Sequence, residues 1–249
     1  MICITGDTHR DFYRLCSVDE NSLLIILGDA SINYYLDIFD RILKDFLKCY
    51  NITLFCIQGN HEERPENIST YKEAEMFGGK VFLEEEYPNL IFAKNGELYE
   101  IDHKKVLVIG GAYSIDKDDR IMDGTPWFKD EQLSKKEMDD ILAKYEGKHV
   151  DVILSHTCPL KYEPVEAFIE GIEELVVDKS MEIFLDKVEE VVDYDKWYCG
   201  HYHIEKEVDK IEFMFESIKL FNKDAIIFKG VSLNYDVISE VDVKKKILS

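Results

Sequence analysis

Short apolar runs alternate with helical patterns along the first sixty residues. Three such runs occupy residues 2–4, 23–27 and 53–57, and each is bounded by polar residues. Short continuous apolar runs of this kind are typical of strands that are buried on both faces. The pattern therefore predicts three buried strands.

A helical period separates the second run from the third. Within residues 35–49, two sets of positions recur on opposite faces of a helix: the charged Asp37, Asp40, Arg41, Lys44, Asp45 and Lys48, and the apolar Ile38, Phe39, Ile42, Leu43 and Phe46. This spacing predicts an amphipathic helix that crosses from one strand to the next. A strand, helix, strand order implies parallel pairing.

The later chain mixes strand-like and helical segments. Residues 81–114 read as an antiparallel meander, and further strands are expected at 150–154, 197–199, 211–215 and 225–228. Ser134 and Glu137 have the spacing of a capping box, which predicts a helix that ends at Gly147. Two more helical stretches are expected within 164–192. The fold class is therefore α/β (α+β), and no linker divides residues 1–249, which we expect to form one domain.

Composition narrows the classes of function. The chain has 249 residues, 46% of them hydrophobic, which is enough for a sizeable core. Its formal charge of −21 repels phosphate backbones and anionic membranes, so stable nucleic-acid binding is not expected. Residues 1–7 lack a basic region, and no later stretch reaches membrane-spanning length. We expect a soluble, cytoplasmic protein without a membrane partner; its oligomeric state is left open.

Five strand-like runs end in polar residues drawn from a narrow set. In chain order the five blocks are Gly6-Asp7-Thr8-His9, Gly28-Asp29, Gly59-Asn60-His61-Glu62, Ser155-His156 and Gly200-His201-Tyr202-His203. Ligands of α/β sheets bind outside the carboxyl ends of the strands, so these side chains should converge on one crevice. Four blocks begin with glycine, which permits a sharp turn and a close approach of the backbone to a ligand.

The residue types indicate what binds there. Aspartate, asparagine and histidine suit manganese, iron, zinc or nickel, and we expect manganese first. Seven such groups are too many for one ion, whereas two divalent ions that share a bridging carboxylate would use them all. Paired ions of this kind usually serve phosphoryl-group hydrolysis. Cys158 and Cys199 lie two residues from histidines of these blocks, but nothing in their spacing requires a thiolate ligand.

Each block taken alone is weak support for a site, because a lone Asp-x-His or Gly-Asp is usually structural. Together they are stronger, since five of the seven histidines fall within the blocks, each just after an apolar run. The two remaining histidines, His103 and His149, are expected at the surface.

The ordered blocks resemble the signature of the calcineurin-like metallophosphoesterase superfamily: Asp-x-His, Gly-Asp, Gly-Asn-His-Asp/Glu, His, then Gly-His-x-His. All five are present between residues 6 and 203. The stretches at 110–116 and 197–200 are similar to a bacterial and phage branch of that superfamily. The resemblance implies a four-layer αββα sandwich, in which two mixed sheets are flanked by helices.

The resemblance also implies roles for single residues. The implied ligands are Asp7, His9 and His203 for the first ion, Asn60, His156 and His201 for the second, and Asp29 as the bridge between the two. His61 would not be a ligand but would face the scissile phosphate, stabilise charge and protonate the leaving oxygen, with Glu62 orienting it. The ions would lower the pKa of water and supply a bridging hydroxide as the nucleophile.

Departures from the family pattern narrow the substrate. Protein Ser/Thr phosphatases and symmetrical dinucleoside tetraphosphatases of the superfamily carry Gly-Asp-x-x-Asp-Arg-Gly, which this chain replaces by Gly28-Asp29-Ala30-Ser31-Ile32-Asn33-Tyr34. Arg10 and Arg64 follow the first and third blocks. With only five arginines in the chain, we interpret these two as a phosphate clamp, the alternative being ordinary surface ion pairs.

The segment 117–132 is polar and irregular but contains Arg120, Trp127 and Phe128. An aromatic lid over a nucleobase is one interpretation, and an aromatic pair that anchors a long loop to the core is the preferred one.

The sequence thus predicts a dinuclear phosphoesterase, a hydrolase with phosphatase or phosphodiesterase activity toward a phosphomonoester or small phosphodiester. A nuclease of the same superfamily is one alternative, although the −21 charge opposes a polymer track. A non-catalytic binding scaffold is the other, although no ligand of the signature is missing.

Overall fold

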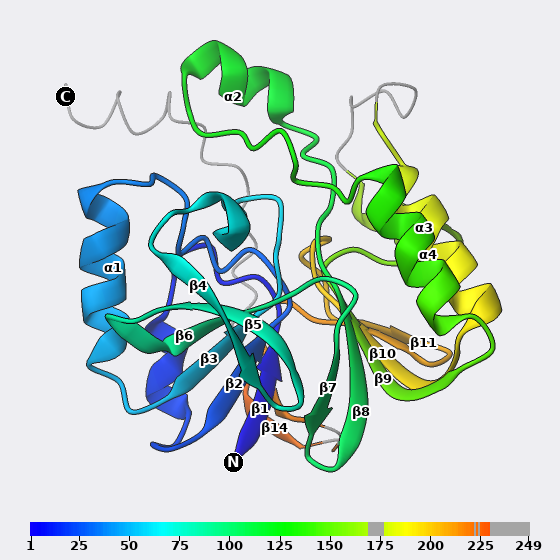
Figure 1. The fold of residues 1–249 in the computed structure, drawn as a ribbon, viewed down its shortest axis with the longest axis horizontal. Helices are drawn as coiled ribbons and strands as arrows, with labels where there is room; N and C mark the ends of the chain where they lie inside the picture. Colours follow the sequence, from blue (N-terminus) through cyan, green and yellow to red (C-terminus); the bar gives the residue numbers. More distant parts are fainter. Residues whose placement is uncertain (169–176, 222, 224, 230–249) are drawn as a thin grey trace, which may run out of the picture.

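Two mixed β-sheets form the centre of the molecule (Figure 1). The computed structural model describes residues 1–168, 177–221, 223 and 225–229. In spatial order, the first sheet contains β14 (Ile226–Phe228), β13 (Ile218–Leu220), β1 (Ile2–Thr5), β2 (Leu23–Ile26), β3 (Thr53–Cys56), β6 (Tyr87–Ala93), β5 (Gly79–Glu84) and β4 (Tyr71–Met76). The second contains β11 (Lys206–Val208), β12 (Ile211–Phe213), β10 (Asp193–Cys199), β9 (His149–Ser155), β8 (Lys104–Ile109) and β7 (Leu98–Ile101).

The centre of each sheet is parallel. β1, β2, β3 and β6 run in one direction in the first sheet, as do β8, β9, β10 and β12 in the second, while antiparallel strands lie at the edges. The predicted parallel pairing of the first three strands is confirmed. All of their carboxyl ends consequently meet at one edge of each sheet.

The predicted meander at 81–114 is wrong in one respect, because its strands belong to both sheets. β5 and β6 pair in the first sheet, whereas β7 and β8 pair in the second. The chain crosses between them at Asn95 and Gly96. Gly96 has φ +72°, and the Asn95 side chain accepts a hydrogen bond from the backbone N–H of Gly110 (2.6 Å) and donates to Gln58 (2.8 Å), so the turn is tied to both sheets.

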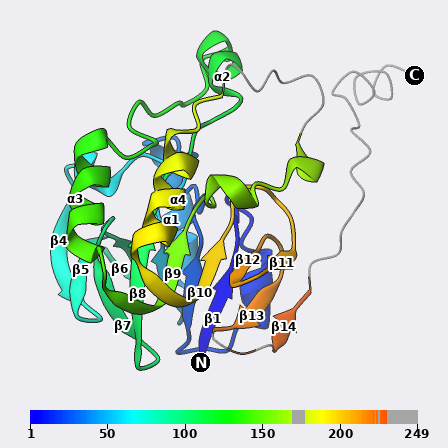
Figure 2. The same ribbon diagram turned by 90° about the vertical axis from the view of Figure 1, so that its right-hand side faces the viewer.

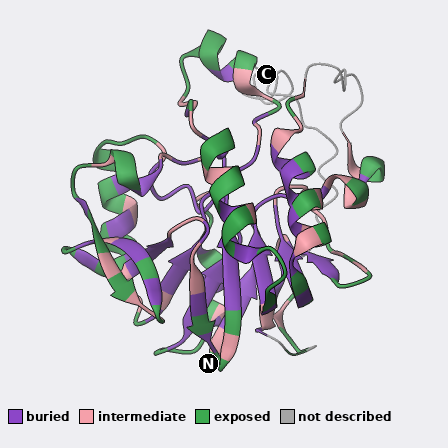
Figure 3. Cartoon of the chain, turned by 45° about the vertical axis from the view of Figure 1, so that its right-hand side comes forward, coloured by how far each residue is buried: buried purple, intermediate pink, exposed green. Residues whose placement is uncertain are grey.

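Helices cover the outer face of each sheet (Figure 2). The first sheet carries α1 (Ile38–Lys48) and the 3₁₀ helix η1 (Tyr13–Ser17); the second carries α3 (Lys135–Tyr145) and α4 (Ser180–Val191). One apolar cluster fills the space between the sheets, with Phe55 and Leu154 among its members, and a further cluster lies under each helical layer. Figure 3 shows the resulting buried strands beneath helices whose outer faces are exposed. The αββα sandwich is therefore confirmed.

Short helices complete the described structure: α2 (Lys117–Asp123), η2 (Pro65–Asn67), η3 (Leu160–Tyr162) and η4 (Val165–Ala167). The segment expected to be irregular thus contains the helix α2. Of the first helical stretch expected after residue 164, only η4 is described, and residues 169–176 lie outside the described residues. No helix within the described ranges combines the length and apolar character needed to span a bilayer.

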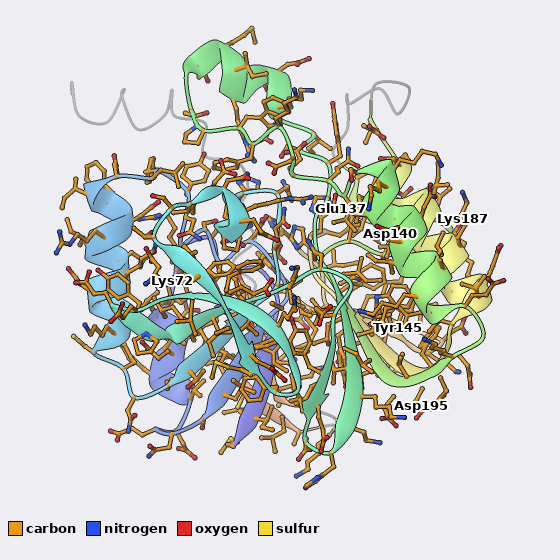
Figure 4. All side chains as sticks on the ribbon, in the orientation of Figure 1. Lys72, Glu137, Asp140, Tyr145, Lys187 and Asp195 are labelled. Carbon is orange, nitrogen blue, oxygen red and sulfur yellow. The ribbon has the colours of Figure 1, made fainter. Side chains whose placement is uncertain are left out.

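The capping box of α3 is confirmed. The Ser134 hydroxyl accepts the backbone N–H of Glu137, and the Glu137 carboxylate accepts the backbone N–H of Ser134 (2.7 Å). Figure 4 shows Glu137 at the first turn of α3 and Tyr145 at its last. Ile141 and Tyr145 are buried against the second sheet, as the periodicity predicts.

The orientation of α1 differs from that of an ordinary amphipathic crossover helix. The helix forms, but its apolar residues Ile38, Phe39, Ile42 and Phe46 point outward and are 48–59% exposed. The inward side instead carries Asp40, Lys44 and Leu47, all buried. The helix therefore turns most of its apolar face away from the sheet.

Ion pairs explain how the charged side of α1 is buried. Lys44 Nζ lies 2.6 Å from Glu84 Oε2, and Asp40 Oδ1 lies 2.5 Å from Arg10 Nη1. Asp40 also accepts the backbone N–H of Leu36 (2.7 Å). Because these charges are paired inside the fold, they fix the rotation of the helix about its axis.

We predict that Lys44→Ala lowers the free energy of unfolding by about 3–5 kcal/mol, because it leaves Glu84 buried without its counter-charge. Lys136→Ala, which breaks the exposed Lys136–Asp140 pair of α3, should change the free energy of unfolding far less, because solvent screens that pair. Urea denaturation measures both. A double variant, Lys44→Leu with Glu84→Leu, should recover most of the loss. Equal effects of the two single variants would show that the buried pair does not fix α1.

Candidate metal centre

The five polar blocks meet where the parallel strands end. The first three follow β1, β2 and β3 of the first sheet, and the last two follow β9 and β10 of the second. Ring and carboxylate contacts join the two groups: His9 Nε2 lies 2.8 Å from His203 Nε2, and His156 Nε2 lies 3.5 Å from Asp29 Oδ2. The sandwich thus brings residues about 195 positions apart into one site.

Glycine is required at two of these strand ends. A Cβ added at Gly59 would lie 1.9 Å from Asp29 Oδ1, and one added at Gly28, where φ is +95°, would lie 2.1 Å from His156 Nδ1. Both distances are far below van der Waals contact, so any side chain would displace a candidate ligand. The glycines therefore permit the close approach that the sequence suggested.

Four candidate ligands have a strained backbone. His9, Asp29, His201 and His203 all have φ between +44° and +68°, the left-handed region that residues with a side chain rarely adopt. Such conformations persist where the surrounding structure fixes them, and they cluster at functional sites. Each of these side chains is thereby turned off its strand direction and toward the site.

Three overlapping groups bring ligand atoms within 4.8 Å of one another. The groups are Asp7 with His9 and His203, Asp7 with Asp29 and His156, and His9 with Asp29 and His61. The first matches the set expected for one ion. Asp29, Asp7 and His9 each belong to two of the groups, so the groups overlap in one cluster. His61 is also within ligand distance of Asp29, so geometry by itself does not separate a ligand role from a catalytic one.

Asp29 is the most contacted of these residues. Its Oδ1 accepts the backbone N–H of His61 (2.8 Å), while Oδ2 lies 3.8 Å from His9 Nε2 and 3.9 Å from His61 Nε2. Burial by itself would raise the pKa of Asp29, but His156 and the other imidazoles outweigh it and hold that pKa well below its ordinary value. The group is a permanent carboxylate at neutral pH.

Hydrogen bonds fix how Asn60 and His156 point. The Asn60 amide donates to Ser114 Oγ (3.0 Å), so its oxygen faces His156 Nε2 (2.9 Å). His156 Nδ1 lies 2.8 Å from the carbonyl of Leu27, which can only accept, so Nε2 is turned to the site. Ser114 is held in turn by Glu131, at both its backbone N–H and its hydroxyl. Outer contacts of this kind orient ligands in metal centres.

Asp7 and His201 are placed at the bottom of the site. Asp7 is fully buried, and both of its carboxylate oxygens accept the backbone N–H of His201, at 3.1 and 3.0 Å. The His201 ring lies beside that of His156, with a centroid distance of 5.0 Å. All seven expected ligands are therefore within one cluster.

His61 faces the opening of the site. Its ring stacks at 6.4 Å on Tyr34, and Arg120 Nη2 reaches both ring nitrogens, with 2.8 Å to Nδ1. Burial lowers the pKa of His61 to about 4, opposed by the carboxylate of Asp29. Glu62 is fully buried and accepts the backbone N–H of Gly59 (3.3 Å). The described contacts of Glu62 thus hold the strand end on which His61 sits.

Arg10 and Arg64 point to other parts of the protein. Arg10 binds Asp40 and the carbonyls of Ser31 and Phe39. Arg64 is buried, and its guanidinium binds Glu137 and the carbonyls of Asp130 and Gln132. Neither residue lines the pocket described below. These partners do not support the clamp expected from sequence position, because each guanidinium is already occupied in joining α1 or α3 to the first sheet.

Arg120, Ser114 and Glu131 were not identified as site residues from the sequence. Arg120 is carried by α2 and is buried at 4% exposure; Asp116 accepts from its Nε (2.8 Å), and its Nη1 has no hydrogen-bond partner among the described residues. Phe128 is buried and lies 6.2 Å from Tyr34, which supports the anchor interpretation of the aromatic pair. The only available signal was the unusual presence of arginine and aromatic residues in a polar segment.

A cavity of about 560 Å³ opens over the cluster. Its lining contains three kinds of residue: the candidate site residues His9, Asp29, Asn60, His61, His201 and His203, the charged residues Asp116, Lys179 and Glu182, and the largely apolar residues Tyr113, Ile115, Ala167, Phe168, Val177, Tyr202 and Ile204. Phe168 stacks on Tyr202 with a centroid distance of 6.3 Å. The pocket has the size of a small-molecule site.

The donor set fits divalent cations. Two carboxylates, one amide oxygen and four imidazoles converge, and the His9 and His203 nitrogens approach as closely as two ligands of one ion. Burial lowers the pKa of both His201 and His203, which keeps those rings neutral and able to donate a lone pair. A second acidic group at His149, Asp151 and Asp195 is on the surface. His103 and His149 are exposed, as predicted.

Comparison with known proteins agrees with this geometry. The family pattern described as calcineurin-like phosphoesterase matches residues 1–205. A comparison with curated protein sequences gives no match. The matched region includes all five polar blocks and the central parallel strands of both sheets apart from β12. The chain therefore belongs to the calcineurin-like phosphoesterase family.

Proposed function

We propose that this protein is a dinuclear metal-dependent phosphoesterase that hydrolyses a phosphomonoester or a small phosphodiester. The observation that carries the proposal is the convergence of seven oxygen and imidazole donors, with Asp29 among them, at one pocket. Asp7, His9 and His203 would hold one ion, and Asn60, His156 and His201 the other. When bound, two divalent ions, of which manganese is the first candidate, supply positive charge for the phosphate and lower the pKa of water.

The residues themselves account for the remaining steps. Asp29 stays ionised. It contacts residues of both ligand sets, so it would hold the two metal positions at a fixed separation. His61 faces the substrate's phosphate, and that anion beside the ring would oppose the lowering of its pKa. His61 then protonates the leaving oxygen.

Arg120 is the cation that we assign to the phosphate in place of Arg10 and Arg64. Like Arg10 and Arg64, Arg120 is not among the residues that line the pocket, but its guanidinium contacts His61 and Asp116, and both of these do line it. Guanidinium groups recognise phosphate oxygens with paired hydrogen bonds.

The alternatives are weaker. A nuclease needs a basic track for a polymer, and the chain carries a net charge of −21. A binding scaffold would have no need for four strained ligand conformations or for a complete ligand set. Incubation of the manganese-loaded protein with mononucleotides, cyclic nucleotides, dinucleotides and single-stranded oligonucleotides tests all three, and turnover of small esters alone is expected.

We predict two metal equivalents per chain. Because Asp29 contacts both ligand sets, Asp29→Asn should weaken both ions, whereas His203→Ala should remove close to one equivalent. Elemental analysis after reconstitution and desalting gives the stoichiometry. One equivalent in the unmodified protein, unchanged in Asp29→Asn, would contradict the dinuclear site.

We predict that His61→Ala keeps two metal equivalents but lowers turnover of esters with poor leaving groups by about 10²–10⁴. Turnover of esters of acidic phenols should fall less, because their leaving oxygen needs no proton. Steady-state kinetics on an alkyl and an aryl phosphate, with metal analysis in parallel, measures both effects. Loss of a metal equivalent would make His61 a ligand.

We predict that Arg120→Ala lowers kcat/KM by about ten- to a hundredfold at constant metal content, since charge-assisted hydrogen bonds contribute about 1.5–3 kcal/mol. The Arg120→Lys variant should have a higher kcat/KM than Arg120→Ala but a lower one than the unmodified protein. Arg41→Ala, at an exposed arginine of α1, is the matched control and should leave kcat/KM unchanged. If Arg120→Ala matches the control, the phosphate is bound by other groups.

A further inference from the structure

The outer face of α1 carries the largest group of exposed apolar side chains among the described residues. We call Ile38, Phe39, Ile42 and Phe46 the α1 stripe; each is 48–59% exposed. Tyr35 and Leu36, just before the helix, are exposed to the same degree. Elsewhere exposed large apolar residues occur singly or in pairs, such as Ile183 on α4. Scattered residues need no explanation, but a contiguous stripe usually marks an interaction surface.

The stripe is held outward by the interactions of the opposite side of the helix. Lys44 with Glu84, and Asp40 with Arg10, would lose buried ion pairs if α1 rotated to bury Ile42. α1 is also the outer layer on its side of the described structure (Figure 1). The buried ion pairs on the opposite side of α1 therefore keep the stripe exposed.

The spacing along the stripe is that of a helix-packing seam. Phe39, Ile42 and Phe46 of α1 and its C-cap residue Cys49 follow one another at intervals of three, four and three residues, and all four are exposed. Alternation of three and four places side chains in line along one face, where they interlock with the same arrangement on a second helix. The seam is well suited to pairing with a copy of itself.

The area of the surface is sufficient for a weak dimer. Six large apolar side chains that are about half exposed offer roughly 600 Å² per chain, so a symmetric pair would bury roughly 1,200 Å² in total. That value lies at the lower limit of specific protein interfaces. Local charge also permits pairing, because Arg41 and Lys48 lie beside Asp37 and Asp45 along the helix edges.

We propose that two copies of this chain associate through their α1 stripes, helix against helix about a two-fold axis. A symmetric contact presents the same seam from both copies, so every apolar residue of the stripe is covered at once. The interface lies on the outer face of the first sheet, and no residue of the α1 stripe lines the pocket. This inference is independent of the proposed phosphoesterase reaction.

Sedimentation velocity of the full chain tests the proposal between about 1 and 500 μM. We expect a monomer–dimer equilibrium with a dissociation constant of about 1–100 μM, as suits an interface of this size. Because each copy carries a charge of −21, association should strengthen as salt rises from about 50 to 500 mM. A protein that remains monomeric throughout this concentration range would overturn the proposal.

Substitutions locate the interface. Ile42→Glu and Ile42→Lys should each weaken association by at least about a hundredfold, since the buried side chain is lost twice per dimer. The lysine variant reduces the net repulsion, so its effect isolates the apolar contact. Ile183→Glu and Ile183→Lys, on the exposed face of α4, are the matched controls and should not change association. Circular-dichroism melting confirms that each variant is folded, and a dimer that persists in both Ile42 variants would place the interface elsewhere.

Discussion

The carboxylate of Asp29 is the contact on which the rest of the site depends. It sits between the strand ends of the two sheets, accepts the backbone N–H of His61, and faces His9 and His156. A buried carboxylate without positive partners is costly, and here the surrounding imidazoles keep it ionised. Gly59 has to be glycine because Asp29 occupies the space of its Cβ. The fold therefore buries the negative charge of Asp29, which only cations, from imidazole or metal, can balance.

The sandwich makes that arrangement possible. Parallel strands at the centre of both sheets direct their carboxyl ends to one edge, and apolar packing between the sheets holds those ends together. Ligands from one sheet thus meet ligands from the other without a long loop. The left-handed backbone at His9 and His203 then turns the imidazoles inward, and the surrounding core stabilises this strain.

The helix α1 shows how charge can override hydrophobic pattern. Its sequence has a clear apolar face, yet Asp40 and Lys44 lie on the inward side. They do so because they form ion pairs there with Arg10 and Glu84. Arg10 follows a ligand block in the sequence, but its guanidinium serves the helix. The same ion pairs that orient α1 thereby leave an apolar stripe at the surface.

The sequence by itself determined the central strands of both sheets and the capping box at Ser134, since strand burial and capping depend on local residue type and spacing, but it did not indicate β4, β11 or β13. It also predicted the seven candidate ligands, whose residue types and positions after the strands are local features. It also determined the family, through the order of the polar blocks. Only the tertiary structure decided that the predicted meander divides between two sheets, that α1 turns its apolar face outward, and that Arg120 contacts His61 in place of the expected arginines. These three results depend on partners far away in the chain, and a local pattern contains no information on which distant charge will pair with which.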